Sequence, residues 1–474
     1  MSRIHRALRI SLLLALAATS AAVTPAQTKP AEGSFAVYQL PEAKRIKLPN
    51  GLVVLLLERH ELPLTSAELV IRSGATADPA GKEGLASVTA ALLRKGTATR
   101  TADQISESAD FIGLTFFAGS SLETSSVSAD FLSRDTDKAL GLMADVVQHP
   151  SFPQDEVTKL IAQRQDQLHA SKDNPQAVIR SYFDHALFGD HPYGRPAGGT
   201  EVSLGAITRD DVAGFHSRTY TPANAVLAIA GDFNSAAMEA KVKELFGGWK
   251  GAAPAPIAVP AAPAVVGKHV VLIDKPDATQ TYFAIGNIGL SRTSPDRAPV
   301  EIVNTLFGGR FTSMFNEELR IKSGYSYGAS SGFALYGTPG PFEMLTYTRN
   351  ATTEPAIDKS FEVLARLHTH PLTETDLTSA KNYLRGTFPP SLETTPALAR
   401  QLALLETQGI SRAQFNKELV DEQATTLADA NRVIDKDFPS DNYVLVIIGK
   451  ASEIGKIASK YGPVTTKKIT DPGF

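Results

Sequence analysis

The chain of 474 residues contains no cysteine. Disulfide bonds, thiolate zinc sites and cysteine nucleophiles are therefore excluded, and an oxidising compartment would place no disulfide on this protein. An excess of one charge is also missing, because 47 basic and 50 acidic residues give a formal net charge of -3. This balance provides no electrostatic case for nucleic-acid binding. The apolar fraction of 43 % is that of an ordinary globular protein, and the length suffices for about two to four domains.

The N-terminal segment, residues 1–26, has the three parts of a secretory signal peptide. It begins with basic side chains, continues in an apolar run from Ile10 to Val23, and ends in small residues near Ala26. We predict cleavage after Ala26. A membrane anchor is the alternative, but the run is shorter than the roughly 20 residues of a membrane span. The mature chain is expected in the periplasm, on the assumption of a Gram-negative source.

The mature chain divides into two parts of similar pattern. Residues 35–250 and residues 267–474 form the two predicted halves, of about 210 residues each. Between them lies an Ala/Pro linker, residues 251–266, whose prolines favour an extended spacer. Both halves mix strands and helices in blocks. This arrangement predicts an α+β fold in which each half is an antiparallel sheet covered on one side by helices.

An internal repeat supports this division. The apolar strand predicted at 222–231 is followed by a helix at 235–246, and the same order recurs at 441–449 and 451–461. The period is too long for a solenoid repeat. The sequence therefore predicts a duplicated domain.

A short helix is predicted between Gly84 and Thr97. Leu85, Val88 and Leu92 have the i, i+3, i+7 spacing of one buried face. Gly96 follows as a left-handed stop.

The frame of this helix, ending in Lys95-Gly96-Thr97, resembles the zinc-binding helix of the M16 metallopeptidases, the family of pitrilysin and the mitochondrial processing peptidase. In active members, the helix carries His-x-x-Glu-His, in which two histidines bind zinc and the glutamate polarises the attacking water. In the register of this frame, those places hold Ser87, Ala90 and Ala91. Alanine has no donor atom, and a neutral serine hydroxyl is a poor zinc ligand.

The third zinc ligand of the family is a glutamate in a later helix that precedes an Asp-Asn-Pro-like turn. Counting back from Asp173-Asn174-Pro175 places Gln167 at this position. An amide carries no charge to offset that of the zinc ion. Because the three ligand positions and the position of the catalytic glutamate have all changed, the chain is expected to bind no metal and to have no cofactor of its own.

A second family motif lies in the C-terminal half. The segment from Glu318 to Gly328 fits the pattern Leu-Arg-x-Lys-x-Gly-x-x-Tyr, with Arg320 and Tyr327 seven positions apart. We predict that Arg320 ends a helix from about Ser313, that Gly324 breaks it, and that Tyr327 begins a strand, so that both side chains face one cleft. The resemblance implies that they bind substrate and stabilise the oxyanion. An arginine at a helix end beside an ordinary strand tyrosine is the alternative.

In the two-chain branch of the family, one subunit carries the zinc motif and the other the arginine and tyrosine. The resemblance therefore implies a non-catalytic, substrate-binding subunit of a heterodimeric zinc peptidase that degrades peptides inside a chamber. This chain would be inactive alone, and the zinc would lie in a homologous partner with His-x-x-Glu-His. The alternatives are a structural or scaffold protein, and an enzyme that acts alone with Ser87 as nucleophile, for which the sequence offers no base.

Two residue pairs that contain histidine are weaker metal candidates. His60-Glu61 begins like His-Glu-x-x-His, but the fifth place is Leu64. His368 and His370 flank one threonine, and no third ligand is apparent. Both pairs are interpreted as surface or loop histidines.

Overall fold

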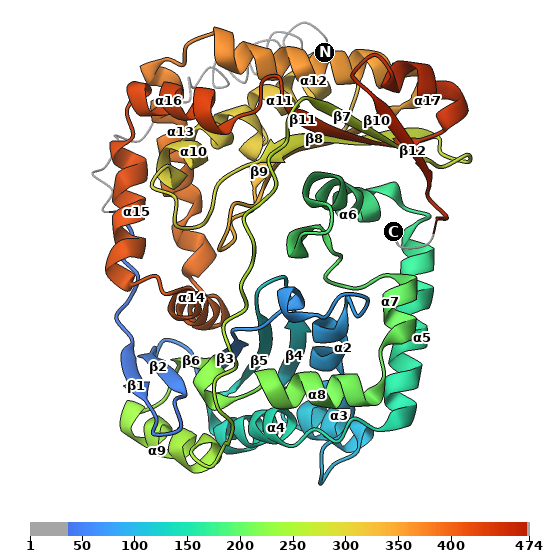
Figure 1. The fold of residues 1–474 in the computed structure, drawn as a ribbon. Helices are drawn as coiled ribbons and strands as arrows, with labels where there is room; N and C mark the ends of the chain where they lie inside the picture. The colour runs from blue at the N-terminus through green and yellow to red at the C-terminus, as the bar shows by residue number, and fades with distance from the viewer. Residues whose placement is uncertain (1–36, 472–474) are drawn as a thin grey trace, which may run out of the picture. The chain divides into compact units, whose positions relative to one another are not determined.

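The computed structural model describes residues 37–471. The predicted signal peptide lies outside the described residues. Within the described range, the strands form two six-stranded sheets, with the orders β1-β2-β6-β3-β5-β4 and β12-β7-β11-β8-β10-β9 (Figure 1). No helix between residues 37 and 471 is long and apolar enough to cross a membrane.

The N-terminal sheet begins with a hairpin. The turn at Asn50-Gly51 joins β1 and β2 as an antiparallel pair, and Gly51 has a φ of 97°, which favours glycine. The strands of this sheet are β1 (Lys44–Lys47), β2 (Val53–Glu58), β3 (Leu64–Ile71), β4 (Thr115–Ser120), β5 (Ser125–Leu132) and β6 (Ala225–Gly231).

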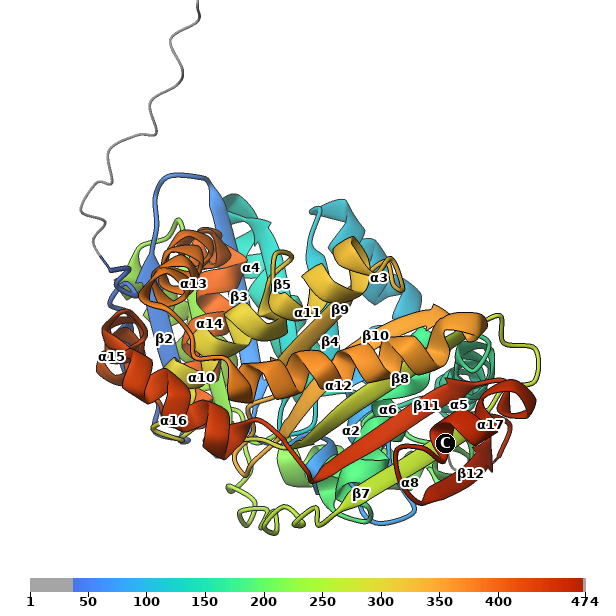
Figure 2. The ribbon, with the colours of Figure 1, turned by 90° about the horizontal axis from the view of Figure 1, so that it is seen from above.

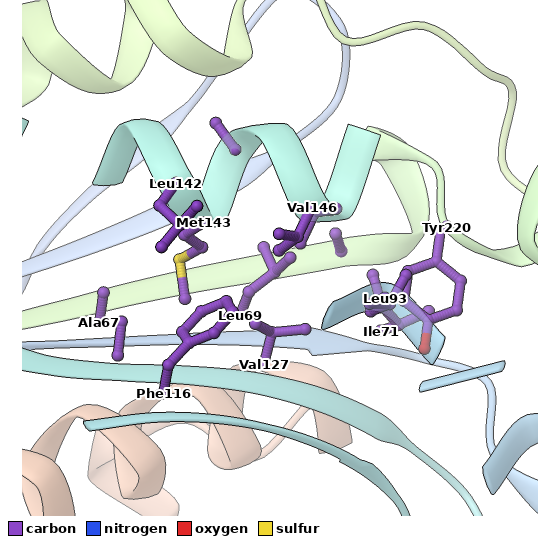
Figure 3. Close-up of a cluster of buried hydrophobic side chains, with 14 of the residues drawn as sticks. Ala67, Leu69, Ile71, Leu93, Phe116, Val127, Leu142, Met143, Val146 and Tyr220 are labelled. Carbon is purple, nitrogen blue, oxygen red and sulfur yellow. The ribbon is translucent and has the colours of Figure 1, made fainter. Parts of the chain in front are cut away.

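Helices cover one face of this sheet and bury its apolar side chains. Met143 and Val146 of α4 pack over Leu69, Phe116 and Val127, which project from three strands into one core (Figure 3). The helices of this half are α2 (Leu85–Leu92), α3 (Ala102–Phe111), α4 (Thr136–Gln148), α5 (Gln154–Ser171), α6 (Pro175–Phe188), α7 (Glu201–Ala206), α8 (Arg209–Thr219) and α9 (Ser235–Phe246).

The C-terminal half repeats this arrangement. Its strands are β7 (Lys268–Asp274), β8 (Gln280–Ile288), β9 (Ala329–Phe333), β10 (Pro341–Arg349), β11 (Tyr443–Gly449) and β12 (Val464–Lys468). Its helices are α10 (Arg297–Asn304), α11 (Met314–Asn316), α12 (Thr353–Thr369), α13 (Glu374–Thr387), α14 (Thr395–Gln408), α15 (Arg412–Ala424), α16 (Leu427–Asp437) and α17 (Ala451–Ala458). The matching strand orders confirm the prediction of two similar α+β halves.

The strand directions differ from the prediction, because each sheet is mixed rather than purely antiparallel. Strand β6 runs parallel to β2, and β11 and β12 run parallel to β7. A parallel pair requires a long crossover connection. The helical block before β6 and its counterpart before β11 provide one, so each returning strand enters the middle of its sheet.

The second face of each sheet is covered by a helix from the other half. Helix α14 packs on β3 and β6, whereas α6 packs on β8 and β11. In Figures 1 and 2, α12 and α17 lie over the opposite face of the C-terminal sheet. Ile179 and Phe183 of α6 share a buried cluster with Ala284 and Val446 of the sheet. The prediction that helices cover only one side of each sheet is therefore wrong. Each half contributes one helix, α6 or α14, to the second face of the other half's sheet.

A polar contact also joins the two halves. Glu123, in the turn between β4 and β5, accepts hydrogen bonds from the hydroxyl of Tyr193 at 2.6 Å and from the main-chain N–H of Gly337 at 2.9 Å. Its other carboxylate oxygen forms an ion pair with Arg292. Residues 251–266, between the halves in sequence, contain no helix or strand.

Candidate functional site

Arg320 lies on a π-helical turn, Glu317–Lys322, that continues α11. A single plain helix from Ser313 was predicted, and the structure instead widens the turn that carries the arginine. Leu319 is completely buried on the inner side of this turn, so the neighbouring Arg320 is held on the exposed side. Single π-helical turns occur frequently at functional sites.

Ion pairs with Glu318 anchor the same turn. The Oε1 atom of Glu318 accepts a hydrogen bond of 2.8 Å from Arg366 of α12 and one of 2.9 Å from Lys322. Burial opposes ionisation of this carboxyl, but the hydrogen bonds from Lys322 and Arg366 leave its pKa below the usual value. The turn is therefore fixed from both sides of Arg320.

Arg320 and Tyr327 lie together. The Nη1 atom of Arg320 donates a hydrogen bond of 2.8 Å to the main-chain carbonyl of Tyr327. The guanidinium also lies over the ring of Phe311, with 4.8 Å between Cζ and the ring centroid. Tyr327 itself is 77 % exposed. The prediction that Tyr327 begins a strand is wrong, because Gly324 has a φ of 62° and the following turn delays β9 until Ala329.

Both residues line one cleft of about 530 Å³, which we call the tyrosine cleft. Its floor is formed by Tyr282 of β8 and Tyr347 of β10, whose rings stack with centroids 5.1 Å apart. Further lining residues come from the start of α6, from β9 and from α13, and include Gln176, Ser330 and Tyr383. The volume lies within the range of ligand pockets. The predicted pair therefore faces one cleft.

The chemistry of the tyrosine cleft suits an extended peptide. The guanidinium and the phenol hydroxyl are hydrogen-bond donors for carbonyl oxygens, and the aromatic rings offer apolar contact. Strand β9 borders the cleft and is the last strand in its sheet. An edge strand offers unpaired N–H and C=O groups to a peptide backbone.

The positions that correspond to the zinc site lie elsewhere, in the N-terminal half. Ala90 is completely buried in α2, Ser87 and Ala91 are half-buried, and Gln167 is exposed on α5. Among residues 37–471, no three His, Asp or Glu side chains are grouped so that they could hold a metal ion. The side chains at these four positions do not fit a zinc site, because the alanines have no donor atom and the serine hydroxyl and the glutamine amide are neutral.

Family models match both halves of the chain. The model described as Insulinase (Peptidase family M16) matches residues 53–201, and that described as Peptidase M16 inactive domain matches residues 206–384. An uncharacterized zinc protease of Mycobacterium leprae is 30 % identical over 344 residues, which cover 72 % of this chain and 77 % of that protein. The chain belongs to peptidase family M16. This finding confirms the resemblance inferred from the motifs.

Solved structures share the fold of this M16 chain. The peptidase M16 inactive domain of Pseudomonas fluorescens superposes with a TM-score of 0.81 at 25 % identity, covering 86 % of this chain and 98 % of that one. A protease from Helicobacter pylori gives a TM-score of 0.79 at 20 % identity, covering 86 % and 100 % of the two chains. The two-half α+β architecture is therefore that of M16 proteins.

One motif in the M16 chain was missed by sequence reasoning. Gly324-Tyr-Ser-Tyr-Gly328 matches the Gly-x-Ser-x-Gly pattern of serine hydrolases, but it leads from a helical turn into a strand, the reverse of a nucleophile elbow. The hydroxyl of Ser326 donates to the carbonyl of Gly328 at 2.8 Å and accepts from Thr346 at 3.0 Å. Ser326 is buried and stabilises the turn that carries Tyr327.

The weaker histidine candidates form local contacts. The Nε2 atom of His368 lies 3.2 Å from the carbonyl of Pro439, and His370 pairs with Thr369. His368 belongs to the last turn of α12 rather than to a loop. His60 lies between Glu58 and Asp232 at the surface.

Proposed function

We propose that this M16 chain is the non-catalytic, peptide-binding subunit of a heterodimeric zinc peptidase. A homologous subunit with His-x-x-Glu-His would supply the zinc ligands and the general base. One observation carries the proposal: Arg320 and Tyr327 line the same cleft of this chain, whereas the positions on α2 that would carry two zinc ligands and the general base hold Ser87, Ala91 and Ala90. The chain therefore has one component of a peptidase site without the other.

In this proposal, the two side chains act on the peptide bond at the partner's zinc. Arg320 binds a substrate carbonyl through a guanidinium that is always charged. Tyr327 donates from its hydroxyl to the oxygen that becomes negative when water attacks the carbonyl carbon. A donor of this kind contributes roughly 3 kcal/mol to transition-state stabilisation. The backbone of the peptide would pair with the edge of β9.

The experiment uses the mature chain alone, the zinc-bearing homologue alone, and their mixture. We expect cleavage of an unstructured peptide only, or far faster, in the mixture, together with a mixed dimer by light scattering. Arg320→Ala should abolish the increase in peptidase activity on mixing. The control Arg134→Ala changes an exposed arginine in the other half and should leave this increase intact. A stable mixed dimer with no change in peptidase activity would overturn the proposal and favour a scaffold.

The location of the pair in the periplasm is part of the same proposal. It rests on the signal-peptide pattern of residues 1–26. The N-terminal residue of the protein isolated from its native host tests it by mass spectrometry. We expect Gln27, and an intact Met1 with a cytoplasmic fractionation pattern would contradict the location.

A further inference from the structure

A second cleft, of about 630 Å³, lies on the N-terminal sheet beside α14. It is lined by β3, β4 and β5 on one side and by α14 with the preceding turn on the other. We call it the carboxylate cleft, because Glu68 of β3 and Asp130 of β5 line its floor.

The carboxylate cleft is the internal counterpart of the tyrosine cleft. Each lies on the face of one sheet that the exchanged helix covers, and the strand registers relate the two. Ser66 pairs with Asp130 across β3 and β5, at the place where Tyr282 pairs with Tyr347 across β8 and β10. Two residues along the same strands, on the same face, the pair Glu68 and Ser128 corresponds to Ala284 and Leu345.

This comparison shows that the fold does not require polar side chains on this face. At the corresponding places, the C-terminal sheet has apolar or aromatic side chains, and Ala284 packs in a buried cluster under α6. Burial of a carboxylate without a compensating cation is costly. The carboxylates of the N-terminal half are therefore an addition to the fold.

Glu68 is only 8 % exposed and forms no ion pair within residues 37–471, where its hydrogen-bond partner is the hydroxyl of Ser126. Asp130 lies beside Ser66, whose hydroxyl donates to Thr395 of α14 at 3.1 Å. Among residues 37–471, the one basic residue that lines the cleft is Arg400 of α14. It lowers the pKa of Glu68 but forms no ion pair with either carboxylate, so both carboxylates lie beside neutral hydroxyl groups without a directly paired cation in the described part of the chain.

We infer that the carboxylate cleft binds the basic side chain of a peptide, a lysine or an arginine. The ammonium or guanidinium group would lie between Glu68 and Asp130 and form the direct ion pairs that these carboxylates lack among the described residues. Phe117, which is 58 % exposed at the rim, would contact the aliphatic stem. The inference rests on the proposed function, because it names a class of peptide substrates for the same subunit.

The charge balance supports a cation rather than an anion. Burial raises the pKa of Glu68 to about 7, and Arg400 lowers it in part. Burial likewise raises the pKa of Asp130. A bound cation would favour the ionised carboxyl and release a proton. A metal ion is a poorer candidate, because no third carboxylate or histidine joins this pair among the described residues.

The test measures binding of two fluorescein-labelled extended peptides to the isolated mature chain by anisotropy. The peptides differ only at one central residue, lysine or glutamine. We expect the lysine peptide to bind about tenfold more tightly at low salt. The variant Glu68→Gln/Asp130→Asn should lose this preference, whereas Asp210→Asn/Glu244→Gln, which removes two exposed acids, should keep it. Arg400→Gln, on the cleft wall, should increase it.

Three outcomes would overturn the inference. The two peptides could bind with equal affinity, neither could bind, or the preference for lysine could survive in Glu68→Gln/Asp130→Asn. If that double variant does not fold, Arg400→Gln decides, since an unchanged preference in this variant contradicts the assignment. Arg320→Ala separates the two proposals. It should abolish activation of the zinc partner and leave the preference for lysine unchanged.

Discussion

The guanidinium of Arg320 binds the main-chain carbonyl of Tyr327, not its phenol hydroxyl. The arginine therefore fixes the backbone of the turn, while the tyrosine side chain extends, largely exposed, along the cleft. Because the pair is joined through the backbone, the hydroxyl can serve a substrate without breaking the contact between the two residues.

Tyr327→Phe should lower kcat of the assembled peptidase by about 100-fold, because it removes one donor to the oxyanion. KM should change little, since the ring remains. The exposed position of Tyr327 predicts an unchanged Tm. Steady-state kinetics and thermal unfolding test this prediction. Tyr325→Phe is the matched control, because Tyr325 packs against the C-terminal core and should be neutral in kcat.

Chelation should not affect the isolated chain. No set of zinc ligands is formed by Ser87, Ala90, Ala91 and Gln167. Incubation with EDTA should therefore leave Tm unchanged, and metal analysis should find far less than one zinc per chain. Loss of zinc from a metal-stabilised fold lowers its stability. A fall in Tm on chelation, reversed by zinc, would place a metal site outside these four positions.

Glu123→Gln should destabilise the chain by about 2 to 4 kcal/mol, because it leaves the Arg292 guanidinium without its ion pair. The Arg292 side chain is 12 % exposed, so water compensates little. The midpoint of urea unfolding tests this prediction. Glu244→Gln, which alters a 65 % exposed side chain, should leave the midpoint unchanged. Tyr193→Phe should cost about 1 kcal/mol, through loss of one hydrogen bond to Glu123.

Glu68→Gln should make the protein more stable at high pH. Burial raises the pKa of Glu68 to about 7, with Arg400 opposing and Asp130 adding to the shift. The folded state therefore holds this proton more tightly than the unfolded chain, and the contribution of Glu68 to stability falls as pH rises from about 4.5 to about 7. The free energy of unfolding of the variant, relative to that of the native chain, should therefore rise by about 1 to 3 kcal/mol between pH 5 and pH 8.

Denaturant unfolding of both proteins at the two pH values tests this difference. Glu244→Gln controls for the loss of a carboxylate, since its exposed side chain should give the same difference from the native chain at pH 5 and at pH 8. A pH-independent effect of Glu68→Gln would mean that Glu68 is ionised in the folded protein throughout this range.

Local sequence patterns predicted most of the elements. The short α2 and the helix predicted at 235–246, which is α9, both follow the prediction. These features depend on near neighbours, above all on the spacing of a buried helical face. The turn before β9 was misjudged, because the π-helical turn is anchored by Arg366 of α12 and Ser326 is hydrogen-bonded to Thr346 of β10, both distant in sequence.

The sequence by itself determined the duplication, the α+β class, the loss of zinc ligands on α2 and the spacing of Arg320 and Tyr327. These properties are carried by residue identity and by periods of a few residues. Only the tertiary structure decided that α6 and α14 are exchanged between the halves, and that Glu68 and Asp130 meet in a cleft equivalent to that of Tyr282 and Tyr347. Strand register and helix exchange join residues far apart in the chain, and no local period records such contacts.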